Sequence, residues 1–337
     1  MSADPTQNIL FETSPFGTLD GIVEHDGRVV YFYLNERPDP AGNQPGKFGT
    51  RACWVRNLAR GPMVLNKAEM AEGKIPMMPR NDCVDAELHQ VPQSESLEIV
   101  WFEEGNGAAL IEVDRESNTR TTLAIIPPWS GVEDFHGYAA NCAHETALAW
   151  PLPENKAMQL RIDRAAEFWN SFTSEGSPFA SLQQQLVDAY NKQFGEQNQK
   201  QYYAIDGGKF PPRGLLRYET ESATILVTVG MSLCSQPAVE LYVDQPSDLR
   251  RVELGVKISR QASDANAELI DTAMQSISTF AAYPWRNHNW LGPGHTIDWS
   301  PSGSKATLVR DNELQLSSFR NDPIGLLWID AENDARR

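Results

Sequence analysis

The residues best suited to recognition or chemistry are concentrated in residues 283–299. This segment holds three tryptophans and two histidines, and Gly292-Pro293-Gly294 predicts a sharp bend. Rigid amphipathic side chains of this kind dominate the energetics of protein interfaces. We therefore expect a partner-binding loop, or the wall of a cleft between two lobes, formed by Trp285, His288, Trp290, Gly292, Gly294 and His295. The alternative is a loop folded over the core, in which these side chains find local hydrogen bonds.

The histidines also allow a metal-binding interpretation. A second group of zinc-ligand types lies in DFHGYAANCAHE at residues 134–145, and His288 and His295 lie seven positions apart. Neither group has the HExxH or paired CxxC spacing that is typical of specific zinc sites. The alternative hypothesis is therefore a metal-dependent hydrolase that uses His136, His144, His288 or His295. The leading interpretation includes no metal and no cofactor.

Signatures of nucleophilic or phosphate-transfer chemistry are missing from the sequence. The chain has no G-x-S-x-G nucleophile elbow and no G-x-x-x-x-G-K-[ST] phosphate loop. Glu103 and Glu104 are adjacent, so on a strand their side chains would point to opposite faces and not converge on one substrate. These observations argue against an enzyme.

The charge of the chain limits the partners that it suits. The 337 residues include 45 acidic and 29 basic side chains, for a formal net charge of −16, and residues 1–150 hold 22 acidic against 11 basic. Such a surface repels nucleic-acid phosphates and attracts a basic protein. No apolar stretch approaches the roughly 20 residues of a membrane helix, and residues 1–5 begin no signal peptide. We expect a cytoplasmic protein that binds neither nucleic acid nor membrane.

The four cysteines, Cys53, Cys83, Cys142 and Cys234, are far apart and form no CxxC pair. A cytoplasmic chain of this length has a sufficient core without disulfides. We therefore expect four buried thiols.

Strands dominate the first part of the chain. Residues 8–34 predict strands with a hairpin at Asp26-Gly27, and residues 97–102, 108–113 and 121–126 predict a small antiparallel sheet. Helices are predicted at residues 154–173 and 178–194, where apolar side chains recur at steps of three and four. In the first helix this apolar stripe consists of Met158, Ile162, Ala165, Trp169 and Phe172.

The second half mixes strands with one further helix. Strands are predicted at residues 201–205, 224–229, 239–243, 251–258 and 324–329, and a helix at 264–282 precedes a loop over 283–303. The strands at 239–243 and 251–258 alternate apolar and polar residues, which predicts half-buried antiparallel strands. The block order favours an α+β fold of two lobes, each a mostly antiparallel or mixed sheet with packed helices. We expect an acidic sheet-rich domain at 1–150, a helical hairpin at 151–200 and a second domain at 201–337.

Four segments of the second half form a combined pattern: LVTVGMS at 226–232, RRVEL at 250–254, NWLGPGHTI at 289–297 and an apolar strand at 324–329. In order and spacing they resemble the suppressor-of-fused domain, over residues 200–332. Two departures stand out: Val229 precedes Gly230 where that family often has a polar residue, and Gln236-Pro237-Ala238 replaces a turn that is often acidic.

This resemblance implies a mixed α/β fold without catalytic activity. Animal members of the family hold a transcription factor through an extended peptide that pairs between two lobes, and some bacterial members resemble immunity proteins against toxins. By this resemblance we expect a bacterial, non-enzymatic binding protein, with neutralisation of a toxin as one such role. Its partner is expected to be a protein or an extended peptide, because exposed strand edges beside side-chain pockets bind such peptides. An acidic inhibitor suits a basic partner, and the sequence predicts no oligomeric state.

Overall fold

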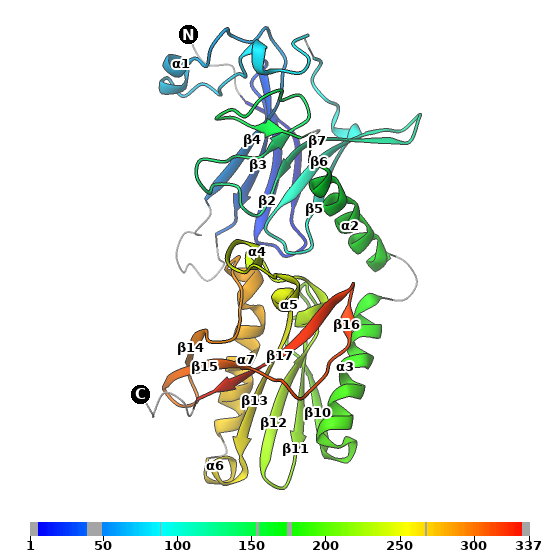
Figure 1. The fold of residues 1–337 in the computed structure, drawn as a ribbon, viewed down its shortest axis with the longest axis vertical. Helices are drawn as coiled ribbons and strands as arrows, with labels where there is room; N and C mark the ends of the chain where they lie inside the picture. Colours follow the sequence, from blue (N-terminus) through cyan, green and yellow to red (C-terminus); the bar gives the residue numbers. More distant parts are fainter. Residues whose placement is uncertain are drawn as a thin grey trace. The chain divides into compact units, whose positions relative to one another are not determined.

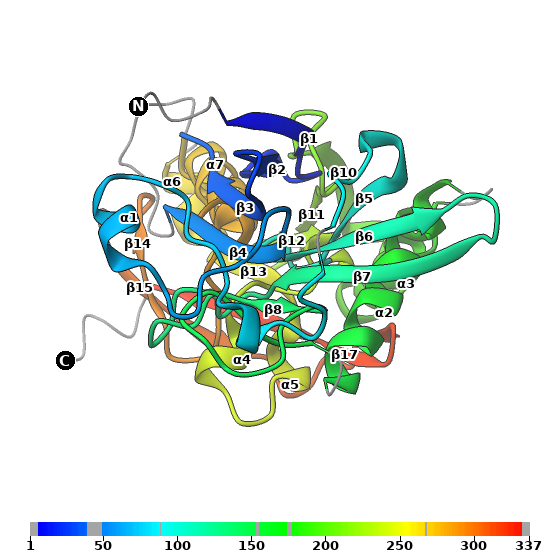
Figure 2. The same cartoon turned by 90° about the horizontal axis from the view of Figure 1, so that it is seen from above.

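The computed structural model describes residues 6–38, 49–87, 89–152, 155–173, 177–266 and 268–331. The chain separates into two compact units, Met1–Trp169 and Asn170–Arg337, here called unit 1 and unit 2. Both units combine strands and helices (Figure 1 and Figure 2). The predicted α+β class is confirmed.

The first sheet of unit 1 is antiparallel, with its strands in sequence order: β1 (Gln7–Thr13), β2 (Leu19–His25), β3 (Val29–Glu36) and β4 (Thr50–Asn57). The predicted strands within residues 8–34 are confirmed, and so is the hairpin at Asp26-Gly27. Gly27 supplies the positive φ that the turn needs, +81°. No strand was predicted for the residues of β4.

The second sheet of unit 1 has the order β5 (Leu97–Trp101), β6 (Ala108–Asp114), β7 (Thr119–Ile126), β8 (Tyr138–Ala139) and β9 (Trp150–Pro151). The pairs from β5 to β8 are antiparallel, as predicted for residues 97–126, and β9 runs parallel to β8. The two sheets share one core, in which Phe32 and Trp54 of the first sheet lie with Ile99 and Leu110 of the second.

Helix α2 (Lys156–Thr173) packs against residues of the second sheet that lie outside this shared core. Met158, Ile162 and Ala165 of the predicted apolar stripe are buried in a cluster with Val100 and Ile125. The predicted helix is therefore confirmed, and so is its buried face at these three positions, whereas Trp169 and Phe172 are half-buried.

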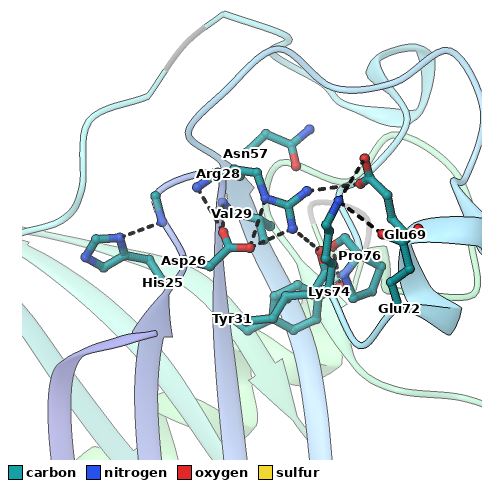
Figure 3. A network of polar contacts seen from close by, with 12 residues as sticks. His25, Asp26, Arg28, Val29, Tyr31, Asn57, Glu69, Glu72, Lys74 and Pro76 are labelled. Carbon is teal, nitrogen blue, oxygen red and sulfur yellow. Dashed lines mark hydrogen bonds and ion pairs between the residues drawn. The ribbon is translucent and has the colours of Figure 1, made fainter. Parts of the chain in front are cut away.

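A charged network fastens the segment after β4 to the β2–β3 hairpin (Figure 3). The Arg28 guanidinium donates to the Asp26 carboxylate at 2.7 Å, to Glu69 at 3.1 Å and to the carbonyl of Ile75 at 3.1 Å. Glu69 lies in the short helix α1 (Lys67–Ala71), and the Lys74 ammonium lies 3.9 Å from its carboxylate. The hairpin thus positions a segment 41 residues further along the chain. The 3₁₀ turns η1 (Arg80–Asp82) and η2 (Ser94–Ser96) follow.

Unit 2 is built on a mixed sheet with the order β10 (Gln199–Ala204), β11 (Gly214–Glu219), β12 (Ala223–Val229), β13 (Arg251–Ser259), β17 (Asp322–Asp330), β15 (Ser304–Arg310) and β14 (Thr296–Trp299). Strands β13 and β17 pair in parallel, and the short β16 (Ser318–Phe319) also pairs with β17. Strands β10 and β14 lie at the two edges. The predicted strands at 201–205, 224–229, 251–258 and 324–329 are confirmed, whereas β11, β14 and β15 had no prediction.

The two long helices of unit 2 are α3 (Pro178–Phe194) and α7 (Glu268–Arg286). Helix α3 contacts β12, and α7 contacts β12 and β13. The side chain of Ser177 caps α3 by accepting from the amide of Phe179, and Gly195, with φ +86°, ends the helix as predicted. The shorter elements are η3 (Glu196–Asn198), η4 (Met231–Leu233), α4 (Val239–Tyr242), α5 (Ser247–Arg250) and α6 (Arg260–Ala265).

Three predictions in unit 2 were wrong in part or in whole. The segment 239–243 is the helix α4 rather than a strand, because Ala238 turns the chain with φ +62° and the alternating run is too short to decide between the two. Strand β13 is central rather than half-buried, since Arg251 and Glu253 are both buried. Helix α7 continues through Pro284 to Arg286, so the predicted loop begins after residue 286 and leads into β14.

Two further expectations concern burial and membranes. Cys53, Cys142 and Cys234 are buried as predicted, but Cys83 is only half-buried, so the prediction was wrong for that residue. Across the described ranges, no helix has both the length and the apolar character to span a bilayer.

Candidate functional site

A buried carboxylate organises the segment that follows β12. Glu253 of β13 is fully buried and accepts four hydrogen bonds. The hydroxyl of Thr228 donates to Oε2 at 2.6 Å, and the hydroxyl of Ser232 donates to Oε1 at 2.6 Å. The amides of Gly230 and Ser232 both donate to Oε1 at 3.0 Å. Burial raises the pKa of Glu253, against the lowering effect of these donors.

Gly230 is required where the chain turns around this carboxylate. Its φ is +104°, which favours glycine. A Cβ at this position would also meet the carbonyl oxygen of Pro212 at 2.6 Å and the ring of Phe179 at 2.7 Å. The glycine therefore brings its amide to Glu253 without a clash.

Arg251 lies two residues before Glu253 and is also buried. Its Nη1 donates to the carbonyls of Ser232 and Leu233 at 3.0 and 2.9 Å, and its Nε lies 3.4 Å from the Asp322 carboxylate of β17. Arg251 and Glu253 thus both hold the turn, Glu253 through the turn's amides and Arg251 through the turn's carbonyls. These contacts account for the sequence patterns at 226–232 and 250–254.

Gln236 connects this turn to the segment rich in tryptophan and histidine. Its Oε1 accepts from the amide of Leu291 at 2.9 Å, and its Nε2 donates to the Leu291 carbonyl at 3.0 Å and to the Leu249 carbonyl at 2.8 Å. The indole N–H of Trp285 donates to the carbonyl of Ser235 at 3.2 Å. The loop 287–295 is therefore fixed at its base by paired polar contacts.

The six residues predicted to bind a partner divide into buried and accessible groups. Trp285 and His288 are each 3% exposed, and Gly292 is also buried. Trp290 and His295 are half-buried, and Gly294 is exposed. The structure therefore places Trp285 and His288 behind the surface, where they support the loop, and leaves Trp290, Gly294 and His295 accessible.

Trp290 lies at the centre of an aromatic cluster with Tyr242 and His295. Its ring stacks on Tyr242 with centroids 6.4 Å apart and meets the His295 ring edge-on at 4.3 Å. Tyr242 is 70% exposed, and partial burial lowers the pKa of His295, which favours the neutral imidazole. A Cβ on Gly292 would lie 2.3 Å from the Trp290 ring, so the glycine makes room for the indole. We call Tyr242, Trp290 and His295 the aromatic cluster.

Sequence reasoning missed Tyr242. It was assigned to a strand at 239–243, and nothing in that pattern connects it with Trp290, 48 positions further along. The only available signal was its aromatic type in a short segment next to the predicted turn at 236–238.

The aromatic cluster borders an edge strand. Backbone bonds from Gly294 to Leu308 and from Leu308 to His295, both 2.8 Å, extend the β14–β15 pairing into the loop. Within the described ranges β14 pairs with β15 alone, so its other side is an open sheet edge. An open edge presents backbone donors and acceptors to an added strand.

The histidines of the alternative hypothesis lie in different units. His136 and His144 are exposed in unit 1, and His288 and His295 belong to unit 2. Over the residues that are described, no group of three or more His, Cys, Asp or Glu side chains is arranged to hold a metal ion. The metal-dependent hydrolase remains a prediction, which elemental analysis of the purified chain would test.

An open depression of about 650 Å³ lies between β10 and α7 in unit 2. It borders the opposite edge of the same sheet and is lined by Tyr203, Ile205, Glu268, Asp271, Met274 and Gln275 among others. None of the residues predicted to bind a partner lines it.

The residues that build this site fall within a known family pattern. Residues 210–329 match the family model of the suppressor of fused protein (SUFU). Over this range the chain is similar to the suppressor of fused family. The match includes Glu253, Gln236 and the aromatic cluster, and it confirms the expected resemblance over that range. Among curated proteins, none matches the chain.

Proposed function

We propose that this chain is a non-enzymatic binding protein whose suppressor of fused domain holds a protein partner at the aromatic cluster. The observation that carries the proposal is that the exposed Tyr242 stacks on Trp290. Trp290 lies in the loop 287–295, which buried polar contacts fix at its base. A rigid aromatic anchor loses little conformational entropy on binding, which is why such residues concentrate interface energy.

The partner we propose is an extended segment of a basic protein. The open edge of β14 next to the aromatic cluster offers backbone pairing, and the aromatic rings offer a surface for alternate side chains. The net charge of −16 favours a basic partner by long-range attraction. The specific role we propose is that of a cytoplasmic bacterial immunity protein that neutralises a basic toxin.

Peptide binding by the full chain tests this proposal. Short synthetic peptides, in which lysine or arginine alternates with apolar residues, are screened for binding to the full chain. Acidic peptides of the same pattern serve as the comparison. The affinity of the best basic peptide is then measured by fluorescence anisotropy. Tyr242→Ala removes an exposed ring without disturbing the core, and we expect it to weaken binding about tenfold or more.

Tyr202→Ala is the matched control, because Tyr202 is a partly exposed tyrosine on β10 at the other edge of the sheet. It should leave the affinity unchanged. Equal binding of basic and acidic peptides, or a loss with Tyr202→Ala and none with Tyr242→Ala, would overturn the proposal.

A further inference from the structure

Cys83 and Cys142 lie directly opposite each other in an antiparallel bridge of unit 1. The amide of Val84 donates to the carbonyl of Asn141 at 2.8 Å, and the amide of Ala143 donates to the carbonyl of Asp82 at 2.8 Å. These bonds flank the two cysteines, which are therefore a non-hydrogen-bonded pair. Such pairs have Cα atoms about 4.5 Å apart, which lies within the range that a disulfide spans.

The side-chain amides of Asn141 and Asn57 hold the backbone after and before Cys83. Asn141 accepts from the amide of Asp85 at 2.7 Å and donates to its carbonyl at 3.0 Å. Asn57, which Figure 3 also shows, makes the same paired contact with Met78, at 2.8 and 3.2 Å. The two cysteine backbones are thus positioned before any bond forms between their sulfurs.

We propose that Cys83 and Cys142 are a thiol modification site that forms a cross-strand disulfide on reaction with a small disulfide such as oxidised glutathione. In the first step the Cys83 thiolate attacks one glutathione sulfur and releases one glutathione thiolate. The Cys142 thiolate then attacks the Cys83 sulfur and releases the second glutathione. The two protein thiols lose two protons, which the two released thiolates take up, so the protein is oxidised and glutathione disulfide is reduced.

The order of the two steps follows from exposure. Cys83 is half-buried and can meet a solvent reagent, whereas Cys142 is buried. The Cys142 thiol now donates to the carbonyls of His144 and Ala149 at 2.9 and 3.3 Å, and the Cys83 thiol to the carbonyl of Pro79 at 3.5 Å. Side-chain rotation away from these carbonyls brings the two sulfurs together.

Burial and the nearby carboxylates make the reaction slow at neutral pH, because they disfavour the thiolate. Burial raises the pKa of each thiol to about 11. The carboxylate of Asp82 adds to the rise for both cysteines, and the Cys142 thiol and Asp85 add to it for Cys83. Accordingly, the site responds to sustained oxidation rather than to a brief pulse.

Cys53 is the competing thiol, because it lies close enough to Cys142 for a thiolate there to raise its pKa, in addition to the larger effect of burial. It lies on β4, opposite Phe32 and not opposite a cysteine. Its thiol donates to the carbonyls of Trp54 and Tyr138 at 3.4 and 3.5 Å. A Cys53–Cys142 bond would lack the cross-strand alignment that the proposed pair has.

Mass spectrometry of the full chain after incubation with oxidised glutathione tests the proposal. We expect the folded protein to lose two hydrogen atoms and peptide mapping to link Cys83 with Cys142. Cys142→Ser should stop at a glutathione adduct on Cys83, and Cys83→Ser should lose about nine-tenths or more of the reaction. Cys234→Ser is the matched control and should react like the natural chain.

Three results would overturn the proposal. One is a link between Cys53 and Cys142 in the folded protein. Another is a stable glutathione adduct on Cys83 of the natural chain while Cys142 remains a thiol. The third is no reaction of the folded protein under conditions in which the urea-unfolded chain is oxidised.

Discussion

Replacement of Glu253 by alanine should destabilise unit 2 much more than replacement by glutamine. Alanine removes the acceptor of four hydrogen bonds. The hydroxyl of Thr228 can turn to the carbonyl of Leu254, 3.3 Å away, but the amides of Gly230 and Ser232 are fixed. Each buried amide left without an acceptor costs about 1–3 kcal/mol, so we expect a loss of about 2–6 kcal/mol.

Glutamine keeps most of this geometry. Its carbonyl oxygen replaces Oε1, which accepts three of the four bonds. Its amide NH₂ group replaces Oε2 and can donate to the oxygen of the Thr228 hydroxyl. Because burial already raises the pKa of Glu253 and so favours its neutral form, a neutral isostere costs little. We expect Glu253→Gln to lose about 1 kcal/mol.

Hydrogen exchange measured by mass spectrometry gives the free energy of opening for each unit separately. Peptides from β12 and β13 report on unit 2, and peptides from β2 and β3 serve as an internal control in unit 1. The reasoning is refuted if the alanine variant stays within about 1 kcal/mol of the natural chain, or if glutamine costs as much as alanine.

The same carboxyl predicts a dependence on pH. Because the folded pKa lies above the ordinary value of 4.5, the folded state binds the proton more strongly than the unfolded state. This contribution to stability is complete below pH 4.5 and is lost as the pH rises through the folded pKa. As the pH rises over this range, the free energy of opening of unit 2 in the natural chain should therefore fall relative to that in the Glu253→Gln variant. A rise relative to the variant would contradict the direction of the pKa shift.

Three further predictions concern single features. Gly292→Ala should displace the Trp290 ring and weaken binding of the basic peptide about tenfold, as measured by anisotropy; unchanged affinity would remove that ring from the site. Arg28→Met removes the bonds to Asp26 and its neighbours and should cost about 1 kcal/mol, seen as faster proteolysis at residues 66–76 with no change in unit 2. The rate of Cys83 oxidation should rise about tenfold per pH unit up to the thiol pKa of about 11; a rate independent of pH would exclude a thiolate step.

The long periodic elements could be predicted from the sequence because their signals are local. The apolar stripe of α2 and the turn at Asp26-Gly27 depend on residues within one helix or one hairpin. The last long helix was predicted to end at residue 282, but α7 continues through Pro284 to Arg286. Proline removes one helical hydrogen bond, and buried Trp285 keeps this turn packed.

The support of the candidate site could not be predicted because its bonds join distant residues. Arg251 and Glu253 were predicted to lie on the polar face of an alternating strand. The groups that hydrogen-bond to them lie 18 to 25 positions earlier, and Asp322 lies 71 positions after Arg251. The pairing of Gln236 with Leu291 spans 55 positions. The sequence predicted a loop over 283–303, which includes residues 287–295, but the contacts that fix those residues follow only from the tertiary fold.

The position of β17 affects how unit 2 is synthesised. This strand lies in the middle of the sheet between β13 and β15, although it follows both in the sequence. While a ribosome makes the chain, one side of β13 therefore has no neighbour until residues 322–330 emerge. Nascent chains that stall earlier expose an apolar strand edge to other polypeptides, so we expect them to be clients of molecular chaperones.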